Sequence, residues 1–365
     1  MVDARTNEYR PDRVSPPGET LRDVIEERHL SQAELATRMG RPKKTISEII
    51  NGKAAITNET ALQLEMVLGV PAEFWSTREQ HYREYLARLE EAAELERLHD
   101  WSKAFPIRAM VKHGLLPSVR DRTEQVRRLL QFLGVSRPDQ WSEVYEHYAV
   151  SFRRSSAFEA DANALGVWLR AGLLKAQAMQ VARYDRDSFV EALTEARALT
   201  RERPEVFQPR LIEACAAAGV AVAFVPQLPK SRVSGATRWL APDLALVQLS
   251  LRYKTDDHLW FTFFHEAAHI LLHGKRAIFL DTSRGEGEEE DEANAWAADF
   301  LIPPPWMAEL TTVPVYSKAI IREFADKIGI SPGIIVGRLQ HDGLLPRSHC
   351  NDLKVRFEWA TGGSR

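Results

Sequence analysis

Apolar side chains recur every three or four positions through most of the chain, which is the spacing of amphipathic helices. The pattern changes after Pro209, where LIEACAAAGVAVAFVPQL predicts a helix, a glycine turn and a strand. SGATRWLA and LALVQLSLRY predict two more short strands, and AIFLD predicts an edge strand. We therefore expect a mostly α protein that contains a small mixed α+β unit with a short β-sheet.

Short helices follow one another near the N-terminus, and two of them form a characteristic pair. Ser31 and Glu34 have the spacing of a capping box that begins a helix, and Gly40 is expected to end it. A second helix is expected from about Pro42 to Ile50, with its isoleucines turned inward. Two short helices joined by a tight glycine turn are the helix-turn-helix arrangement, whose second helix enters the major groove of DNA.

Polar and basic side chains lie on the outer side of this predicted pair. They provide a local cationic surface for phosphates, although the whole chain has a net charge of −3. The candidate DNA contacts are Gln32, Arg41, Lys43, Lys44, Ser47, Asn51 and Lys53. A helical bundle that binds only other proteins is the alternative.

The segment PPGETLRDVIEERHLSQAELATRMGRPKKTISEIINGKAAITNETALQLEMVLGVPAEFW closely resembles the XRE-type helix-turn-helix domain of HigA-like antitoxins over its whole length. The resemblance implies a five-helix DNA-binding domain that acts as a homodimer on a palindromic operator in double-stranded DNA. It also implies autorepression and a toxin as a partner. Pro42 and the outward-facing Glu48 depart from the family's pattern, so no base preference is carried over.

A second chemical pattern lies in WFTFFHEAAHILLHG, residues 260–274. If residues 257–273 form one helix, its polar positions are spaced by three and four and form one narrow stripe on an apolar surface. A solvent-exposed face would be wider and richer in lysine and glutamate, so this stripe predicts a cleft. It consists of His258, Thr262, His265, Glu266, His269 and His273.

The stripe contains the motif HExxH. His265 and His269, one turn apart, can bind one Zn²⁺ through neutral imidazole nitrogens. Glu266 lies about 100° around the helix from His265, where it can act as the general base that takes a proton from the attacking water. His273 is too far along the axis to be a third ligand. A polar helix face that binds no metal is the alternative.

A catalytic zinc needs a third protein ligand, and the acidic run GEGEEEDE can provide it. The helix expected after this run has an apolar stripe between Ala293 and Leu301. When the helix is extended toward the N-terminus at about 100° per residue, Glu289 and Glu290 fall on the same face as this stripe. The phase alone therefore leaves two candidates.

EDEANAWAADFLIP resembles the third-ligand helix of ImmA/IrrE-like metallopeptidases, and the likeness extends over about residues 205–345. The resemblance implies a minimal, gluzincin-like zincin with one Zn²⁺ per chain, Glu290 as third ligand and Glu266 as catalytic residue. Trp296 stands where the family usually has phenylalanine. Residues expected to support the ligands or contact the substrate are Asn294, His273, Tyr253 and Arg238.

This resemblance also implies a zinc endopeptidase that cuts a repressor or another regulatory protein and relieves repression under stress. From the fold we expect the substrate to add as an extended strand beside SGATRWL. The alternative is a non-catalytic HigA-like antitoxin or autorepressor whose zincin fold serves as a sensing or docking module. FADKIGISPGIIVGRLQHDGLL also has helix-turn-helix spacing, but its exposed residues are not basic, so we expect closing helices of the peptidase domain.

Composition adds few constraints. With 365 residues, 44% hydrophobic and 27% charged, the chain is long enough for two or three compact units. The polar N-terminus predicts no signal peptide, and no segment reaches the roughly 18 apolar residues of a membrane span, so we expect a cytoplasmic protein without a membrane partner. The expected parts are a flexible tail at 1–17, a helix-turn-helix domain at 18–80, a helical connector or middle domain at 81–204, a metallopeptidase domain at 205–345 and a tail at 346–365.

Overall fold

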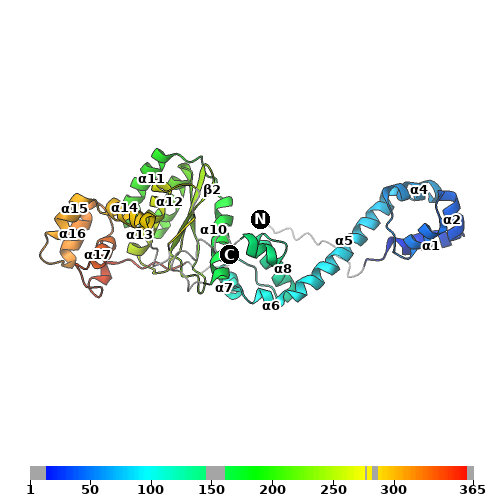
Figure 1. The fold of residues 1–365 in the computed structure, drawn as a ribbon, viewed down its shortest axis with the longest axis horizontal. Coiled ribbons are helices and arrows are strands. Elements are labelled where there is room, and N and C mark those ends of the chain that lie inside the picture. The colour runs from blue at the N-terminus through cyan, green and yellow to red at the C-terminus, as the bar shows by residue number, and fades with distance from the viewer. Residues whose placement is uncertain (1–13, 145–160, 276–277, 282–286, 360–365) are drawn as a thin grey trace. The chain divides into compact units, whose positions relative to one another are not determined.

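The computed structural model describes residues 14–144, 161–275, 278–281 and 287–359. The chain divides into two compact units, residues 1–98 and residues 99–365. Helices dominate both units, and within the described ranges strands occur only in the second (Figure 1). The expected mostly α fold with a small mixed sheet is confirmed.

The first unit is a helical bundle around one apolar core. Leu21, Leu35, Ile46, Leu64 and Trp75, one from each helix, are fully buried in it. The helices are α1 (Pro17–Glu27), α2 (Gln32–Met39), α3 (Lys43–Ile50), α4 (Asn58–Leu68) and α5 (Ala72–Arg97).

Local interactions explain where α2 begins and ends and which face of α3 is buried. The Ser31 hydroxyl accepts a hydrogen bond from the Glu34 amide at 3.1 Å, which satisfies a free N–H of the first turn of α2. Gly40 ends α2 with φ 65°, a conformation that glycine adopts without strain. Ile46, Ile49 and Ile50 of α3 are buried, as the sequence predicts.

The second unit is built around a four-stranded mixed sheet with the order β1-β3-β2-β4. β1 and β3 are parallel, whereas β2 pairs antiparallel with both β3 and β4. The strands are β1 (Val220–Phe224), β2 (Gly235–Ala241), β3 (Leu244–Leu249) and β4 (Ile278–Asp281). β4 is an edge strand, as expected. The expected addition of a substrate strand beside β2 is wrong, because β4 already pairs with Gly235–Arg238.

Helices cover both faces of the sheet, so its alternating side chains enter two different cores. Val220 and Val222 of β1 face the core that contains α11, α12 and α13 (Asp256–Leu272), whereas Ala221 and Ala223 face α10. Figure 1 shows α10 on one side of the strands and α11 to α13 on the other. The helices before and around the sheet are α6 (His99–Ser102), α7 (Ile107–Lys112), α8 (Arg122–Leu133), α10 (Ala162–Gln177), α11 (Arg186–Ala198), the short η1 (Leu199–Arg201) and α12 (Pro204–Ala217).

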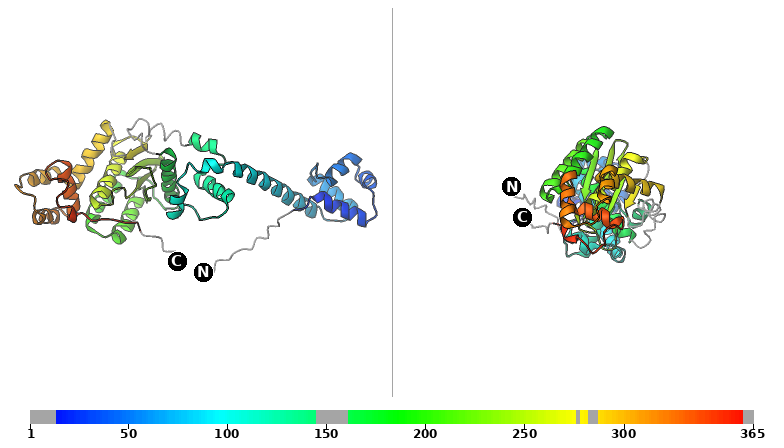
Figure 2. Two further views of the ribbon diagram at one scale, coloured as in Figure 1. Left: turned by 90° about the horizontal axis from the view of Figure 1, so that it is seen from below. Right: turned by 90° about the vertical axis from the view of Figure 1, so that its left-hand side faces the viewer.

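The remaining helices form a layer on the side of the sheet away from α10. The central helix is α13, which packs on β2 and β3 and also contacts α14 and α17. In the left view of Figure 2 the last helices lie beyond α13 and α14, as seen from the sheet. They are α13 (Asp256–Leu272), α14 (Glu288–Leu301), α15 (Pro304–Thr311), α16 (Lys318–Ile328), α17 (Pro332–His341) and η2 (Asn351–Leu353).

The helix-turn-helix-like spacing near the C-terminus corresponds to α16 and α17. Gly329, with φ 74°, ends α16, and Ile335 and Leu339 of α17 are fully buried in the core that α13 shares. Because this face of α17 is covered, α17 belongs to the unit around the sheet, in line with our expectation.

The expected boundary at residue 204 falls inside the second unit, where α8 and α10 share a core with β1 and β3. The domain limits therefore stay predictions. Among the described helices none combines the length and apolar character that crossing a membrane requires.

Candidate metal centre

α13 carries the HExxH motif and is buried on nearly all sides. The sheet covers one side of the helix, and α14 and α17 cover others. His265, Glu266 and His269 are exposed by only 3%, 0% and 1% of their surface. Burial of ionisable groups is costly unless each one has a partner, so the contacts of these three side chains decide what the centre can do.

Two histidines and one carboxylate converge at this point. His265 Nε2 lies 3.2 Å from one carboxylate oxygen of Glu290, and His269 Nε2 lies 3.5 Å from the other. The two Nε2 atoms are 3.1 Å apart. Glu290 reaches them from the first turn of α14, whereas its neighbour Glu289 is exposed. The tertiary structure thus separates the two candidates that helical phase left open.

This group of atoms fits a metal ion. One donor atom from each of the three residues lies within 4.8 Å of the others. Burial lowers the pKa of His269 to about 2, and the neighbouring His265 and His273 contribute to this shift. The imidazole of His269 is therefore neutral. The neutral ring is the form that binds metals. Two imidazole nitrogens and one carboxylate oxygen are the ligand set of many catalytic zinc sites.

Glu266 is held by strand β2. The Thr237 hydroxyl donates a hydrogen bond to the backbone carbonyl of Glu266 at 2.9 Å. A Cβ atom added to Gly235 would lie 2.5 Å from a carboxylate oxygen of Glu266 and 2.6 Å from Cγ2 of Thr262. A larger residue at this position would therefore have to displace the side chain of Glu266 or Thr262. Gly235 was not among the residues expected at the site, although a glycine within a strand is a known signal of close approach by another group.

A chain of contacts runs outward from His269. Its Nδ1 lies 2.8 Å from Nδ1 of His273, and Nε2 of His273 lies 3.3 Å from a carboxylate oxygen of Glu292. If His269 binds a metal through Nε2, its Nδ1 carries the proton and donates to His273. His273 Nε2–H then donates to Glu292. Such contacts fix the orientation of a metal-binding ring. Glu292, the last residue of this chain of contacts, was not among the residues expected at the site.

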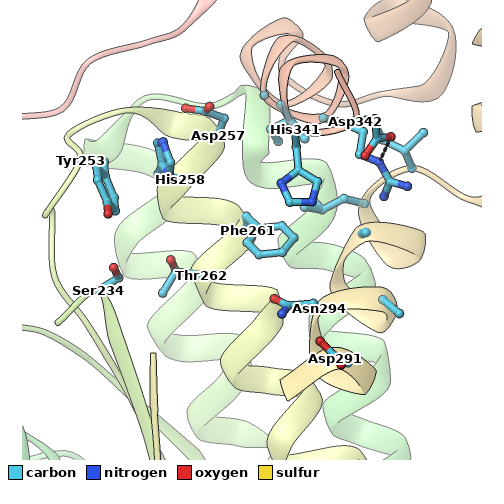
Figure 3. A pocket seen from close by; sticks show the side chains of 17 residues that line it. Ser234, Tyr253, Asp257, His258, Phe261, Thr262, Asp291, Asn294, His341 and Asp342 are labelled. Carbon is cyan, nitrogen blue, oxygen red and sulfur yellow. Dashed lines mark hydrogen bonds and ion pairs between the residues drawn. The ribbon is translucent and has the colours of Figure 1, made fainter. Parts of the chain in front are cut away.

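A cavity of about 620 Å³ opens beside the centre, between α13, α14 and α17. Asn294 and Tyr253, both expected near the site, line it (Figure 3). Tyr253 also stacks on His258, with ring centroids 4.3 Å apart.

Arg238 does not belong to this site. It is buried on the opposite face of the sheet, where its guanidinium donates a hydrogen bond to the carbonyl of Leu169 in α10 at 3.0 Å. The expectation that Arg238 supports the ligands or contacts the substrate is corrected, because successive residues of a strand point to opposite faces. Thr237, the neighbour of Arg238, is the residue that faces α13.

The candidate DNA contacts lie on and around α3, and most of them are exposed. Lys43, Lys44, Asn51 and Lys53 are exposed, and Gln32 and Ser47 are half-buried. Asn51 also donates hydrogen bonds to the carbonyl of Ser47 at 2.7 Å and to its hydroxyl at 3.3 Å, which closes the end of α3.

Arg41 has a different environment from the lysines. Its side chain is only 20% exposed, it lies 3.2 Å from Glu59, and it donates a hydrogen bond to Gln63. Both partners belong to α4, so Arg41 links the turn between α2 and α3 to the rest of the bundle.

Comparison with known families matches both ends of the chain. Residues 21–75 match the helix-turn-helix family, and residues 246–340 match the IrrE N-terminal-like domain of the M78 peptidases. The second match contains α13, α14 and most of α17. Both families agree with the resemblances that the sequence analysis identifies.

Individual relatives match less than a quarter of the chain. The uncharacterised HTH-type transcriptional regulator YddM of Escherichia coli is 30% identical over 82 residues, which are 22% of this chain and 85% of YddM. The addiction module antidote protein of a HigA family from Coxiella burnetii is 29% identical, with coverage of 23% and 94% and a TM-score of 0.22. The antitoxin HigA of Pseudomonas aeruginosa, solved with the higBA promoter, is 27% identical, with the same coverage and TM-score.

Proposed function

The chain belongs to the helix-turn-helix transcriptional regulators, and we propose that it is a DNA-binding regulator with a zinc endopeptidase in its C-terminal part. The peptidase hydrolyses a peptide bond in a repressor or another regulatory protein. The observation that carries this proposal is the convergence of His265, His269 and Glu290 beside the buried Glu266.

The DNA-binding part rests on the α2–α3 pair and its exposed lysines. Lys43, Lys44 and Lys53 can contact phosphates, which provide affinity without sequence selectivity. The partner is double-stranded DNA with a palindromic operator, bound by a homodimer. The likeness to YddM supports the regulator assignment.

The three residues would hold one Zn²⁺, which would polarise a carbonyl oxygen and make a water molecule more acidic. Glu266 takes the proton of the attacking water and delivers it to the nitrogen of the leaving amine as the peptide bond breaks. Gly235 and Thr237 keep Glu266 in place, and His273 orients His269.

The test combines metal content with proteolysis. Purified full-length protein should contain about one zinc per chain, as expected for a site with three protein ligands, and His265→Ala should lose it. Candidate repressors should be cut by the wild type but not by Glu266→Gln, a variant of nearly the same shape that cannot act as a base. The inactive Glu266→Gln protein is also suited to capture the substrate.

The alternative is a non-catalytic antitoxin-like autorepressor with a toxin as partner. Zinc bound without any Glu266-dependent cleavage would favour it, because the zincin fold would then serve only for sensing or docking. A protein that binds neither zinc nor another divalent metal would overturn the proposed peptidase.

A further inference from the structure

The cavity beside the metal centre has one apolar wall. This wall is formed by Phe261 of α13, Ala298 and Leu301 of α14, Ile302, and Ile334 of α17. In Figure 3, Phe261 lies between His341 of α17 and Asn294 of α14. Ala298 and the nearby Ala295 and Gly337 have almost no side chain, and their small size leaves the space open. Cavities of this volume commonly bind ligands.

The cavity begins one helical turn from the residues of the proposed centre. Phe261 precedes His265 by four positions, Thr262 precedes Glu266 by four, and Asn294 follows Glu290 by four. One turn of helix is about 5.4 Å long, and each residue of an extended peptide spans about 3.5 Å. A peptide with its scissile carbonyl at the centre therefore places the side chains of the next one to three residues in the cavity.

Three aspartates line the cavity together with one arginine and two histidines. Asp257 is paired with Lys354 at 2.6 Å and Asp342 with Arg338 at 2.7 Å, so both charges are balanced within the protein. Asp291 is exposed at the rim and follows Glu290 directly. The carboxylate of Asp291 disfavours an acidic side chain nearby, whereas the apolar wall favours an apolar one.

We propose that this cavity binds a bulky apolar side chain of the substrate within three residues of the scissile bond, and that the size of residue 298 sets this preference. The inference rests on the proposed peptidase function and names its substrate class: segments with leucine, phenylalanine or a similar residue next to the cut, and without acidic residues at that position.

The experiment uses small hydroxamates, which bind a metal without being cleaved. One series consists of acetyl amino acid hydroxamates, with the side chain on the amino side of the metal-binding group. A second series consists of succinyl hydroxamates, with the side chain on the carboxyl side. Each series has a methyl, an isobutyl and a carboxymethyl member, and their dissociation constants are measured by calorimetry on the zinc-loaded full chain.

In one of the two series we expect the isobutyl member to bind about tenfold tighter than the methyl member, the effect of burying a branched apolar side chain. The carboxymethyl member should bind most weakly. Ala298→Leu should reduce the preference to about threefold or less. Ala308→Leu, at an exposed alanine of α15 outside the cavity, is the matched control and should keep the full preference.

The outcomes separate the two proposals. If all members bind but neither series shows a preference, or if Ala298→Leu keeps it, the inference is overturned while the metal centre stands. If the zinc-loaded chain binds no member, the inference is overturned; if the chain takes up no zinc, the metal centre fails and the inference fails with it. Should thermal melting show that Ala298→Leu is poorly folded, Ala295→Leu, at the exposed end of the same wall, takes its place with the same expectation.

Discussion

The backbone of Gly235 in β2 passes the side chain of Glu266 in α13 so closely that a Cβ at position 235 would overlap it. A Cβ on Gly235 would lie 2.5 Å from a carboxylate oxygen and 2.8 Å from Cγ of Glu266. Glu266 is fully buried, and Thr262 closes the same space from the preceding turn of α13. The position of the proposed base is thus set by the strand.

Gly235→Ala should therefore impair catalysis more than metal binding. The added methyl group must displace the Glu266 side chain, and a shift of about 1 Å in a reacting group costs on the order of a hundredfold in rate. We expect the zinc content to stay near that of the wild type, measured by mass spectrometry, while the rate of substrate cleavage falls. Gly274→Ala is the control, because a Cβ at Gly274 meets no atom within 4 Å. An equal loss of cleavage rate in Gly235→Ala and Gly274→Ala would contradict the proposed role of Gly235.

Removal of His273 should weaken zinc binding. His273 accepts from Nδ1 of His269 and orients its ring, so we expect His273→Phe to lower the zinc affinity about ten- to hundredfold in competition with a chelator. Glu292→Gln should have a smaller effect, because the Glu292 side chain is 61% exposed. Glu288→Gln, at an exposed acid in the same helical turn, should not change the affinity. An unchanged affinity in His273→Phe would show that the contact has no orienting role.

Metal removal should destabilise the second unit. A ligand that binds only the folded state stabilises it by about 4 kcal/mol at a concentration one thousand times its dissociation constant. Chelation should therefore lower the melting temperature of the wild type and leave His265→Ala unaffected. Equal melting curves for the wild type with and without chelator would count against a metal held by the folded protein.

Asp256 should make the stability of the protein depend on pH. Burial raises the pKa of its carboxyl group to about 6, and the charge of Asp257 adds to this effect, while the hydrogen bond donated by Ser331 opposes it. Between these two pKa values, the folded state therefore holds a proton that the unfolded chain, with a pKa of 3.8, has released. This contribution to stability is fully present below about pH 4 and is lost as the pH rises through 6, by up to about 3 kcal/mol.

Asp256→Asn imitates the protonated carboxyl group and should be more stable than the wild type at pH 7. The difference between the two should shrink as the pH falls from 6 to 4, in denaturant titrations at several pH values. Asp326→Asn, on the surface of α16, is a suitable control for the loss of a charge. A constant difference at all pH values would show that the pKa of Asp256 is not raised.

In the first unit, we expect Lys43 and Lys44 to contact DNA and Arg41 to stabilise the fold. Lys43→Ala with Lys44→Ala should weaken DNA binding for all sequences and reduce the slope of log affinity against log salt by about 2, roughly one per phosphate contact. Both lysines are exposed, so the melting temperature should not change. Arg41→Ala should instead lower the stability, because Arg41 bonds Glu59 and Gln63 of α4. A double lysine variant with an unchanged salt slope would remove α3 from the DNA interface.

The sequence by itself determined what depends on neighbours along the chain. The capping of α2 by Ser31, the glycine that ends it and the buried isoleucines of α3 are set within one or two helical turns. The narrow polar stripe of α13 follows in the same way from 3.6 residues per turn, and it places His265 and His269 on one face. Periodicity within one helix also limited the acidic candidates to Glu289 and Glu290.

Only the tertiary structure decided which groups from separate elements meet. The packing of α14 on α13 brings Glu290 to the two histidines and leaves Glu289 exposed. The pairing of β4 with β2 closes the edge where a substrate strand was expected, and the two faces of β2 send Thr237 to α13 and Arg238 to α10. Register and packing depend on contacts between residues far apart in the chain. A hydrophobic pattern records that a position is buried, but it does not record against which partner.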